Sequence, residues 1–225
     1  MPDPEITPHE RNLRKVFWSG RELAVRVARL SVLFEDLRLE STAARFTDPI
    51  PQIDTTTKNY RYWYFLRRML VTLDEFASAF HQINANDEWK RIRKGFDTEM
   101  EKRWDAAVKY FSTNRPKWND LRDSIGGHLK EKAVAYAVDQ FRPDATGTVE
   151  IVVHREEQTA GIRLLYAEEI VAIALHQAMG HGDHTDEQVR AYMNELFTLL
   201  LTAEGEAVKA VHVIAAVYIV NRFKS

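Results

Sequence analysis

The most regular pattern of apolar positions in the chain lies between residues 58 and 85. Apolar residues recur there in alternating steps of four and three, which places them along one stripe of a helix. The stripe comprises Tyr62, Leu66, Met69, Leu73, Phe76, Phe80 and Ile83. It covers about three heptads, which is short for a free-standing coiled coil. We therefore expect a long helix packed inside a bundle, against another helix of the chain or of a second copy.

Weaker stripes predict helices near both ends of the chain. The first helix is expected from Thr7 to about Leu39, with Gly20 inside the stripe. Its apolar positions are Val16, Leu23, Val27, Leu30, Phe34 and Leu37. Two or three helices are expected to complete the chain, at about 167–179, 185–203 and 205–222. The adjacent acids Asp74 and Glu75 point in different directions on a helix and are interpreted as solvent-facing.

Two further helices are predicted in the middle of the chain. The third helix is expected to begin near Asp87, a candidate N-cap, and to run through Gly95. It should end near Arg115, because the following Pro116 disfavours helical geometry in the residue before it. A fourth helix is then expected from Trp118 to Phe141. The apolar positions of the third helix are Trp89, Ile92, Phe96, Met100, Trp104 and Phe111.

Residues 142–166 have a different character. Two runs, TVEIVVH and GIRLLY, are rich in β-branched or apolar residues and are separated by the polar REEQTA. This arrangement predicts a small β-hairpin. The predicted fold class is therefore all-α, a single domain over residues 1–225. It is an up-and-down bundle of long amphipathic helices with a hairpin insertion near 147–166 and C-terminal helices over 167–223.

Composition narrows the function classes. The 225 residues are 45% hydrophobic and 28% charged, and none is cysteine. The missing cysteines exclude disulfides, thiolate metal sites and a cysteine nucleophile, and they fit a cytoplasmic location. The polar N-terminus lacks the apolar core of a signal peptide. The most apolar stretch, 207–220, contains Lys209 and His212 and is shorter than the ~20 residues of a membrane span, so no membrane association is expected.

Charge is unevenly distributed along the chain. The overall net charge is −2, but residues 58–143 contain 17 lysines and arginines against 12 acids, a net charge of +5. Residues 144–225 carry a net charge of −6. A positive middle segment fits a surface that faces phosphate. The alternative, which we favour, is a middle segment that packs against the acidic end and is partly neutralised by it.

The stretch from Leu121 to Leu129, LRDSIGGHL, is the most informative for chemistry. It places Arg122 and His128 with five residues between them and Asp123 directly after the arginine. In this motif, and in the long amphipathic helices before it, residues 57–141 resemble the HEPN group (higher eukaryotes and prokaryotes nucleotide-binding). HEPN proteins are helical bundles marked by an arginine, usually a polar residue, and then a histidine.

The resemblance implies a function and a site. Many HEPN proteins are metal-independent ribonucleases in which the motif residues of two subunits meet in a dimer cleft. By this resemblance His128 is the general base on the ribose 2′-hydroxyl, which suits its near-neutral titration. Arg122 is the phosphate clamp, and Asp123 orients one of the two. The implied partners are RNA and a second copy bound through the long helices, with no cofactor.

The same residues also have structural interpretations. The Gly126-Gly127 pair permits close helix packing, Arg122 then pairs with an acid such as Asp120 or Glu131, and His128 caps a helix. Many HEPN relatives are also non-catalytic. The competing hypothesis is therefore a helical interaction module in a defence or regulatory complex, binding a protein partner through the stripe of residues 62–83.

A second group of polar residues lies near the end of the chain. His176, His181 and His184, with Asp183 between the last two, are ligand types for zinc or another transition metal. Gly180 and Gly182 favour a loop there instead of a preorganised helical face, and the spacing is not that of a HExxH site. A helix-end loop with capping side chains explains the group as well, so these histidines are weak metal candidates and no metal is assigned.

Overall fold

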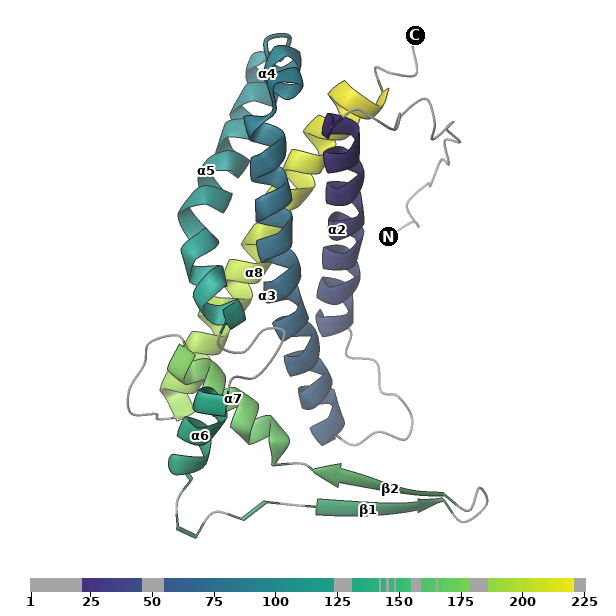
Figure 1. Cartoon of the computed structure of the whole chain (residues 1–225). Helices are drawn as coiled ribbons and strands as arrows, with labels where there is room; N and C mark the ends of the chain where they lie inside the picture. The colour runs from purple at the N-terminus through teal and green to yellow at the C-terminus, as the bar shows by residue number, and fades with distance from the viewer. Residues whose placement is uncertain are drawn as a thin grey trace, which may run out of the picture.

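A computed structural model describes residues 22–45, 55–123, 131–141, 143–144, 146–147, 149–154, 159–164, 166–178 and 186–220. Nearly all of this part of the chain is helical (Figure 1). Four long helices form its body: α2 (Glu22–Arg45), α3 (Thr55–Ala85), α5 (Thr98–Leu121) and α8 (Asp186–Ile214). The prediction of a mainly α-helical protein is confirmed.

The four long helices form a closed ring. Helix α2 packs on α3, α3 on α5, α5 on α8, and α8 packs back on α2. Their directions alternate, so each helix is antiparallel to the next (Figure 1). Helix α2 therefore lies diagonally across the bundle from α5, the helix that ends at the Arg122 motif. A six-residue π-helical stretch, Ala215–Val220, continues α8 to the end of the described chain.

Shorter elements cover the two ends of the bundle. Helix α4 (Asp87–Arg93) connects α3 to α5 at one end. At the other end α6 (Glu131–Asp139) packs on α7 (Ala167–Ala178), beside two strands (Figure 1). The strands β1 (Val149–His154) and β2 (Thr159–Leu164) pair antiparallel, with Val149 opposite Leu164.

The chain just before β1 and the chain just after β2 approach each other closely, at Gly147 and Tyr166. A side-chain Cβ built on Gly147 would lie 2.9 Å from the Cβ of Tyr166. That distance is shorter than carbon atoms tolerate, so glycine permits the approach. The strand pair thus leaves the helical body and returns to it at one point, within the segment for which a hairpin is predicted.

The apolar stripe of residues 62–83 lies in the core of the bundle. Leu66, Met69, Leu73, Phe76, Phe80 and Ile83 are each at most 3% exposed. Phe80 packs on Trp104 of α5 with ring centroids 4.5 Å apart, and Trp104 packs on Trp89 of α4 at 4.6 Å. The partners of the stripe are therefore helices of the same chain. The hypothesis that this stripe is the contact surface for another protein is wrong, because its side chains are already covered.

The helices of the middle segment begin and end at other residues than predicted. The expected third helix is divided into α4 and α5 by a turn that contains Gly95. Asn86, not Asp87, is the N-cap of α4, and its side-chain oxygen accepts from the backbone N–H groups of Glu88 and Trp89. Asp97 caps α5 by accepting from the N–H of Met100 at 2.8 Å. Each cap satisfies amide donors that lack partners at a helix start.

Two expected breaks are absent. Helix α5 runs through Pro116 to Leu121, and α8 runs through Gly205. An interior proline removes one helical hydrogen bond, but the helix on both sides of Pro116 is held by packing. Phe111 before the proline and Trp118 after it are both buried in the core, at 3% and 0% exposure. Tertiary contacts thus outweigh the local preference to stop at Pro116.

Among the described residues, no helix combines the length and the apolar character needed to cross a bilayer.

Candidate functional site

Arg122 lies at the end of α5, where the helix gives way to a short wider turn. It is the first residue after Leu121 and keeps right-handed helical geometry, with φ −56° and ψ −46°. Its backbone N–H donates to carbonyl groups of the preceding turn. Its side chain points toward α3, where it meets the carboxylate of Asp74. The position of Arg122 is therefore set by the last turn of α5 and by the packing of α5 on α3.

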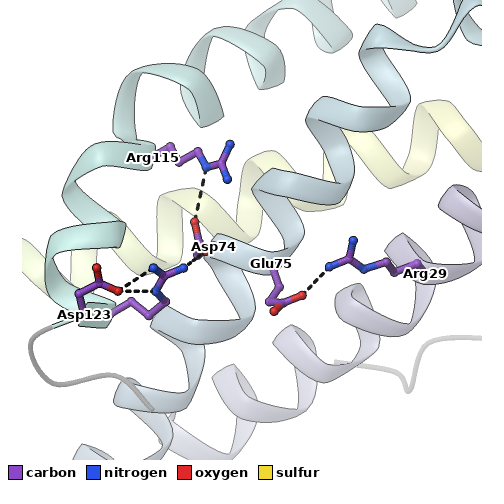
Figure 2. Close-up of polar contacts among 6 residues, drawn as sticks. Arg29, Asp74, Glu75, Arg115 and Asp123 are labelled. Atoms are coloured by element: carbon purple, nitrogen blue, oxygen red, sulfur yellow. Dashed lines mark hydrogen bonds and ion pairs between the residues drawn. The ribbon is translucent and has the colours of Figure 1, made fainter. Parts of the chain in front are cut away.

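Asp74 is a nearly buried carboxylate shared by two arginines. Its side chain is 8% exposed. One carboxylate oxygen accepts from Nη1 of Arg122, and the other lies 3.5 Å from Nε of Arg115 (Figure 2). Arg115 on α5 and Arg122 directly after its end are seven residues apart, about two helical turns, and Arg122 keeps helical geometry, so both face α3. A buried charge is costly unless it is paired, and the two guanidinium groups provide the pairing.

Asp123 binds the same guanidinium group from the solvent side. Its Oδ1 accepts from Nε and Nη2 of Arg122, at 2.9 and 2.6 Å. The hydrogen bond to Asp123 is the largest influence that raises the pKa of Arg122, and the negative charge of Asp74 adds to it. Arg122 therefore carries a full positive charge in a fixed orientation, with one carboxylate buried behind it and one exposed in front.

The predicted site is brought together in part. The structure joins Arg122 to Asp123, as expected if Asp123 orients the arginine. His128 belongs to residues 124–130, which lie outside the described residues, as does the Gly126-Gly127 pair. The acids proposed as structural partners of Arg122, Asp120 and Glu131, are not the ones that bind it.

Sequence reasoning missed Asp74, although it is the buried member of the cluster. It precedes Arg122 by 48 positions, and the adjacent pair Asp74-Glu75 had been interpreted as solvent-facing. That interpretation is right for Glu75, which is 50% exposed and pairs with Arg29 of α2 at 2.5 Å (Figure 2). It is wrong for Asp74. The available signal was its position directly after Leu73, on the side of the core stripe that faces α5.

The histidine group near the chain end is outside the described side chains. His176 falls within α7 but its side chain is not described, and His181 and His184 lie between α7 and α8 outside the described residues. Among the residues that the structure does describe, no three histidine, aspartate or glutamate side chains gather where they would hold a metal ion.

The charge balance of the Arg122 cluster determines what it can bind. Two guanidinium groups face two carboxylates, so the cluster is neutral as it stands. Exposure differs among its members: the side chain of Asp123 is 52% exposed, that of Arg122 33% and that of Asp74 8%. An incoming phosphate would therefore exchange with Asp123, while Asp74 keeps the guanidinium in place. The arrangement suits an anion-binding arginine that is paired at rest.

Comparison of the chain with known protein families, with curated proteins and with solved structures finds no match.

Proposed function

We propose that the protein binds RNA and cleaves it without a metal ion, in the manner of the HEPN ribonucleases that its Arg122–His128 motif resembles. The observation that supports this most directly is the guanidinium of Arg122. It is anchored from behind by buried Asp74 and covered in front by the exposed Asp123. Arg122 would bind the scissile phosphate after displacing Asp123. The proposal includes a homodimer and a cytoplasmic location.

The proposed reaction uses His128 as the base. The histidine accepts the proton of the ribose 2′-hydroxyl, and the 2′-oxygen attacks the adjacent phosphorus. The bond from phosphorus to the 5′-oxygen breaks, and that oxygen takes a proton from water or from the histidine. Arg122 stabilises the additional negative charge on the phosphoryl oxygens during the attack. The products are a 2′,3′-cyclic phosphate and a 5′-hydroxyl, so no metal is required at any step.

End-labelled single-stranded RNA, incubated with the protein in EDTA, tests the proposal. We expect cleavage with cyclic phosphate ends by the wild type and a loss of at least about 100-fold in rate for His128→Gln, the usual contribution of a general base. Arg122→Gln should lose both binding and cleavage. Arg103→Gln is the matched control, because Arg103 is exposed on the same helix and, among the residues that the structure describes, pairs only with Glu99.

Folding and function are separated by thermal unfolding of each variant. His128→Gln changes no member of the Asp74 cluster, and a loss of cleavage counts for the proposal when the unfolding temperature of this variant equals that of the wild type. If the wild type neither binds RNA at low salt nor cleaves it, the proposal is wrong. The same conclusion follows if Arg103→Gln is as impaired as Arg122→Gln, because the arginine motif would then have no special role.

A second candidate is supported by the outer face of α2. Val25, Val32 and Leu39 are seven residues apart and 62%, 62% and 68% exposed, so they form a solvent-facing apolar line. We propose as the alternative a non-catalytic interaction module that uses this line, in place of the buried stripe of α3. Because α2 lies across the bundle from α5, two chains paired through α2 would keep their Arg122 residues apart.

Sedimentation tests this alternative with a second copy as the first partner. Self-association that Val32→Glu abolishes, without RNA cleavage by the wild type, would favour the interaction module. A monomeric wild type would leave the apolar line without a role in self-association, and retained self-association in the variant would assign the contact to another surface.

A further inference from the structure

Arg67 of α3 is a partly exposed arginine whose guanidinium group has no acidic partner among the described residues. Its Nε is buried and has no hydrogen-bond partner. Its two terminal nitrogens are not among the buried atoms that lack a partner, and they form no hydrogen bond or ion pair with the part of the chain that the structure describes. The outer edge of the guanidinium group is therefore open to solvent, while its inner edge is enclosed by the protein.

The packing around Arg67 does not account for its charge. Trp63 and Leu70, one turn before it and one turn after it on the same side of α3, are 9% and 0% exposed. A guanidinium group beside such apolar residues loses part of its hydration, and here it gains no ion pair in return. A long uncharged side chain would cover the same surface without that cost. A residue that lowers stability in this way is expected where a ligand binds.

Arg67 lies on the same stripe of α3 as Asp74, the carboxylate that binds Arg122. The two residues are seven positions apart, which is about two turns and about 10 Å along the helix axis. Helix α5 is antiparallel to α3 and ends beside Asp74 (Figure 1). Arg67 is therefore the charged residue of this stripe that lies just past the end of α5, on the side toward which α5 points.

Arg67 also changes the charge balance of this region. The cluster of Arg115, Arg122, Asp74 and Asp123 contains two guanidinium groups and two carboxylates, so it is neutral as it stands. Arg67 adds a positive charge that no carboxylate of the described chain balances. A partly buried charge is screened by salt less than a fully exposed one. The stripe thus carries a net positive charge next to Arg122.

We propose that Arg67 is a second phosphate-binding residue, which holds a backbone phosphate of the RNA next to the phosphate at Arg122. This inference rests on the proposed function and adds a contact outside the Arg122–His128 motif. A planar guanidinium group matches two phosphate oxygens through parallel hydrogen bonds. Because Arg67 binds away from the bond that breaks, it positions the RNA strand and takes no part in the proton transfer.

The probe is a 2′-O-methylated oligouridylate of about ten nucleotides, a usual site size for single strands. It cannot be cleaved, because it has no 2′-hydroxyl proton. Fluorescence anisotropy at several salt concentrations gives the affinity and its salt dependence. For a single strand the slope of log K against log salt is about 0.7 for each phosphate neutralised. Arg67→Met should weaken binding about tenfold at low salt and reduce the slope by about 0.7.

A double variant shows whether the two arginines hold different phosphates. Arg122→Gln should also reduce the slope by about 0.7, and the variant that carries both substitutions should lose about 1.4. Arg61→Met is the matched control on α3. Arg61 lies six positions before Arg67 and on another side of the helix, where its guanidinium carbon is 5.9 Å from the centroid of the Phe65 ring. Its removal should leave the slope unchanged.

Thermal unfolding separates a binding role of Arg67 from a structural one. Arg67→Met should unfold at the temperature of the wild type or above it, because methionine fills the same space without a desolvated charge. A lower unfolding temperature would assign Arg67 to the stability of the fold and overturn the inference.

Three results of the binding experiment would also overturn it. Arg67→Met could keep the affinity and slope of the wild type, Arg61→Met could lose as much, or the double variant could lose no more than Arg122→Gln alone. In each case the wild type still binds RNA, so the proposed function stands. A wild type that binds no RNA overturns the proposed function and this inference together.

Discussion

Asp74 concentrates several interactions on one side chain. It is almost buried on α3, and the groups that neutralise it, Arg115 and Arg122, both come from α5. These contacts join the two helices near the point where α5 ends. Removing the carboxylate would therefore affect the packing of α5 and the orientation of Arg122 together.

Asp74→Asn is expected to lower the free energy of unfolding by about 2 kcal/mol. Removing one member of a buried ion pair costs about 3–5 kcal/mol, and the partial exposure of both arginines reduces that loss. Urea denaturation measures the difference. Glu75→Gln is the matched control, since the adjacent Glu75 is half-exposed and should contribute less than about 1 kcal/mol. Equal losses in the two variants would contradict the importance given to burial.

Glu40 provides a prediction about pH. Glu40 is 7% exposed, and one of its carboxylate oxygens, Oε2, is buried and accepts no hydrogen bond from the part of the chain that the structure describes. Burial raises the pKa of Glu40, whereas the hydrogen bond from Thr72 and the positive charge of Arg68 act in the opposite direction and nearby Asp36 adds to the rise. The folded state therefore binds the Glu40 proton more tightly than the unfolded state does.

The stabilising contribution of protonated Glu40 is complete below its unfolded pKa and is lost as the pH rises through its folded pKa. Glu40→Gln should therefore be more stable than the wild type at neutral pH. The advantage should disappear as the pH falls below the unfolded pKa. Thermal unfolding across pH 3–8 measures this. An advantage that stays constant with pH would refute the argument, and Glu35→Gln, which is exposed on the same helix, should show none.

At the scale of residues, local partners were predictable and distant ones were not. Asp123 is next to Arg122 in sequence, so their pairing follows from proximity. Asp74 reaches Arg122 only because α3 and α5 pack together. A carboxylate adjacent to a core stripe is buried or exposed according to which helix covers it, and the spacing of apolar residues along one helix does not identify that neighbour.

The caps of α5 and α4 show how the elements are delimited. Asp97 accepts from the N–H of Met100 and begins α5 after the turn that contains Gly95. Asp97→Ala should lower the free energy of unfolding by about 1 kcal/mol, the usual value of an N-cap. Chemical denaturation measures the loss. Asp97→Ser keeps an acceptor at the cap and should recover most of the stability; if it is as unstable as Asp97→Ala, capping is not the cause.

The periodic apolar stripes predicted which segments are helical. The helix ends that were inferred from single glycine and proline residues were in several cases misplaced. Gly95 was placed inside a helix and lies in a turn, because the chain must reverse between α3 and α5 at that end of the bundle. Pro116 and Gly205 were assigned to helix ends and lie inside helices, where buried neighbours hold the backbone. Preferences of single residues amount to about 1–3 kcal/mol, which several buried side chains in one turn can outweigh.

For the whole molecule, the buried apolar stripe of α3 should contribute far more to the free energy of unfolding than the exposed apolar line of α2 (Val25, Val32 and Leu39). Leu73 is fully buried, so Leu73→Ala should lower the free energy of unfolding by about 2–5 kcal/mol. Val32 is 62% exposed, and Val32→Ala should stay within about 0.5 kcal/mol of the wild type. Urea denaturation of both variants tests this. A large loss in Val32→Ala that depends on protein concentration would reveal an interface on α2.

The bundle was predictable as a class, whereas the order of its helices around the core was not. Seven-residue spacing in the segment 62–83 requires a partner helix but does not identify it. The ring of α2, α3, α5 and α8 depends on which apolar faces match in three dimensions. For the same reason, the stripe of α3 was open to interpretation as an external contact surface until its burial was observed.

The closed ring has a mechanical consequence. Helices α2 and α8 are antiparallel neighbours, and α2 begins at the same end of the bundle where α8 finishes (Figure 1). Force applied between Glu22 and Ile219 would therefore peel the two helices apart from one end, breaking their contacts a turn at a time. Force applied between Glu22 and Glu187 would act along both helix axes and load all of those contacts at once. The protein should yield at a lower force in the first geometry than in the second.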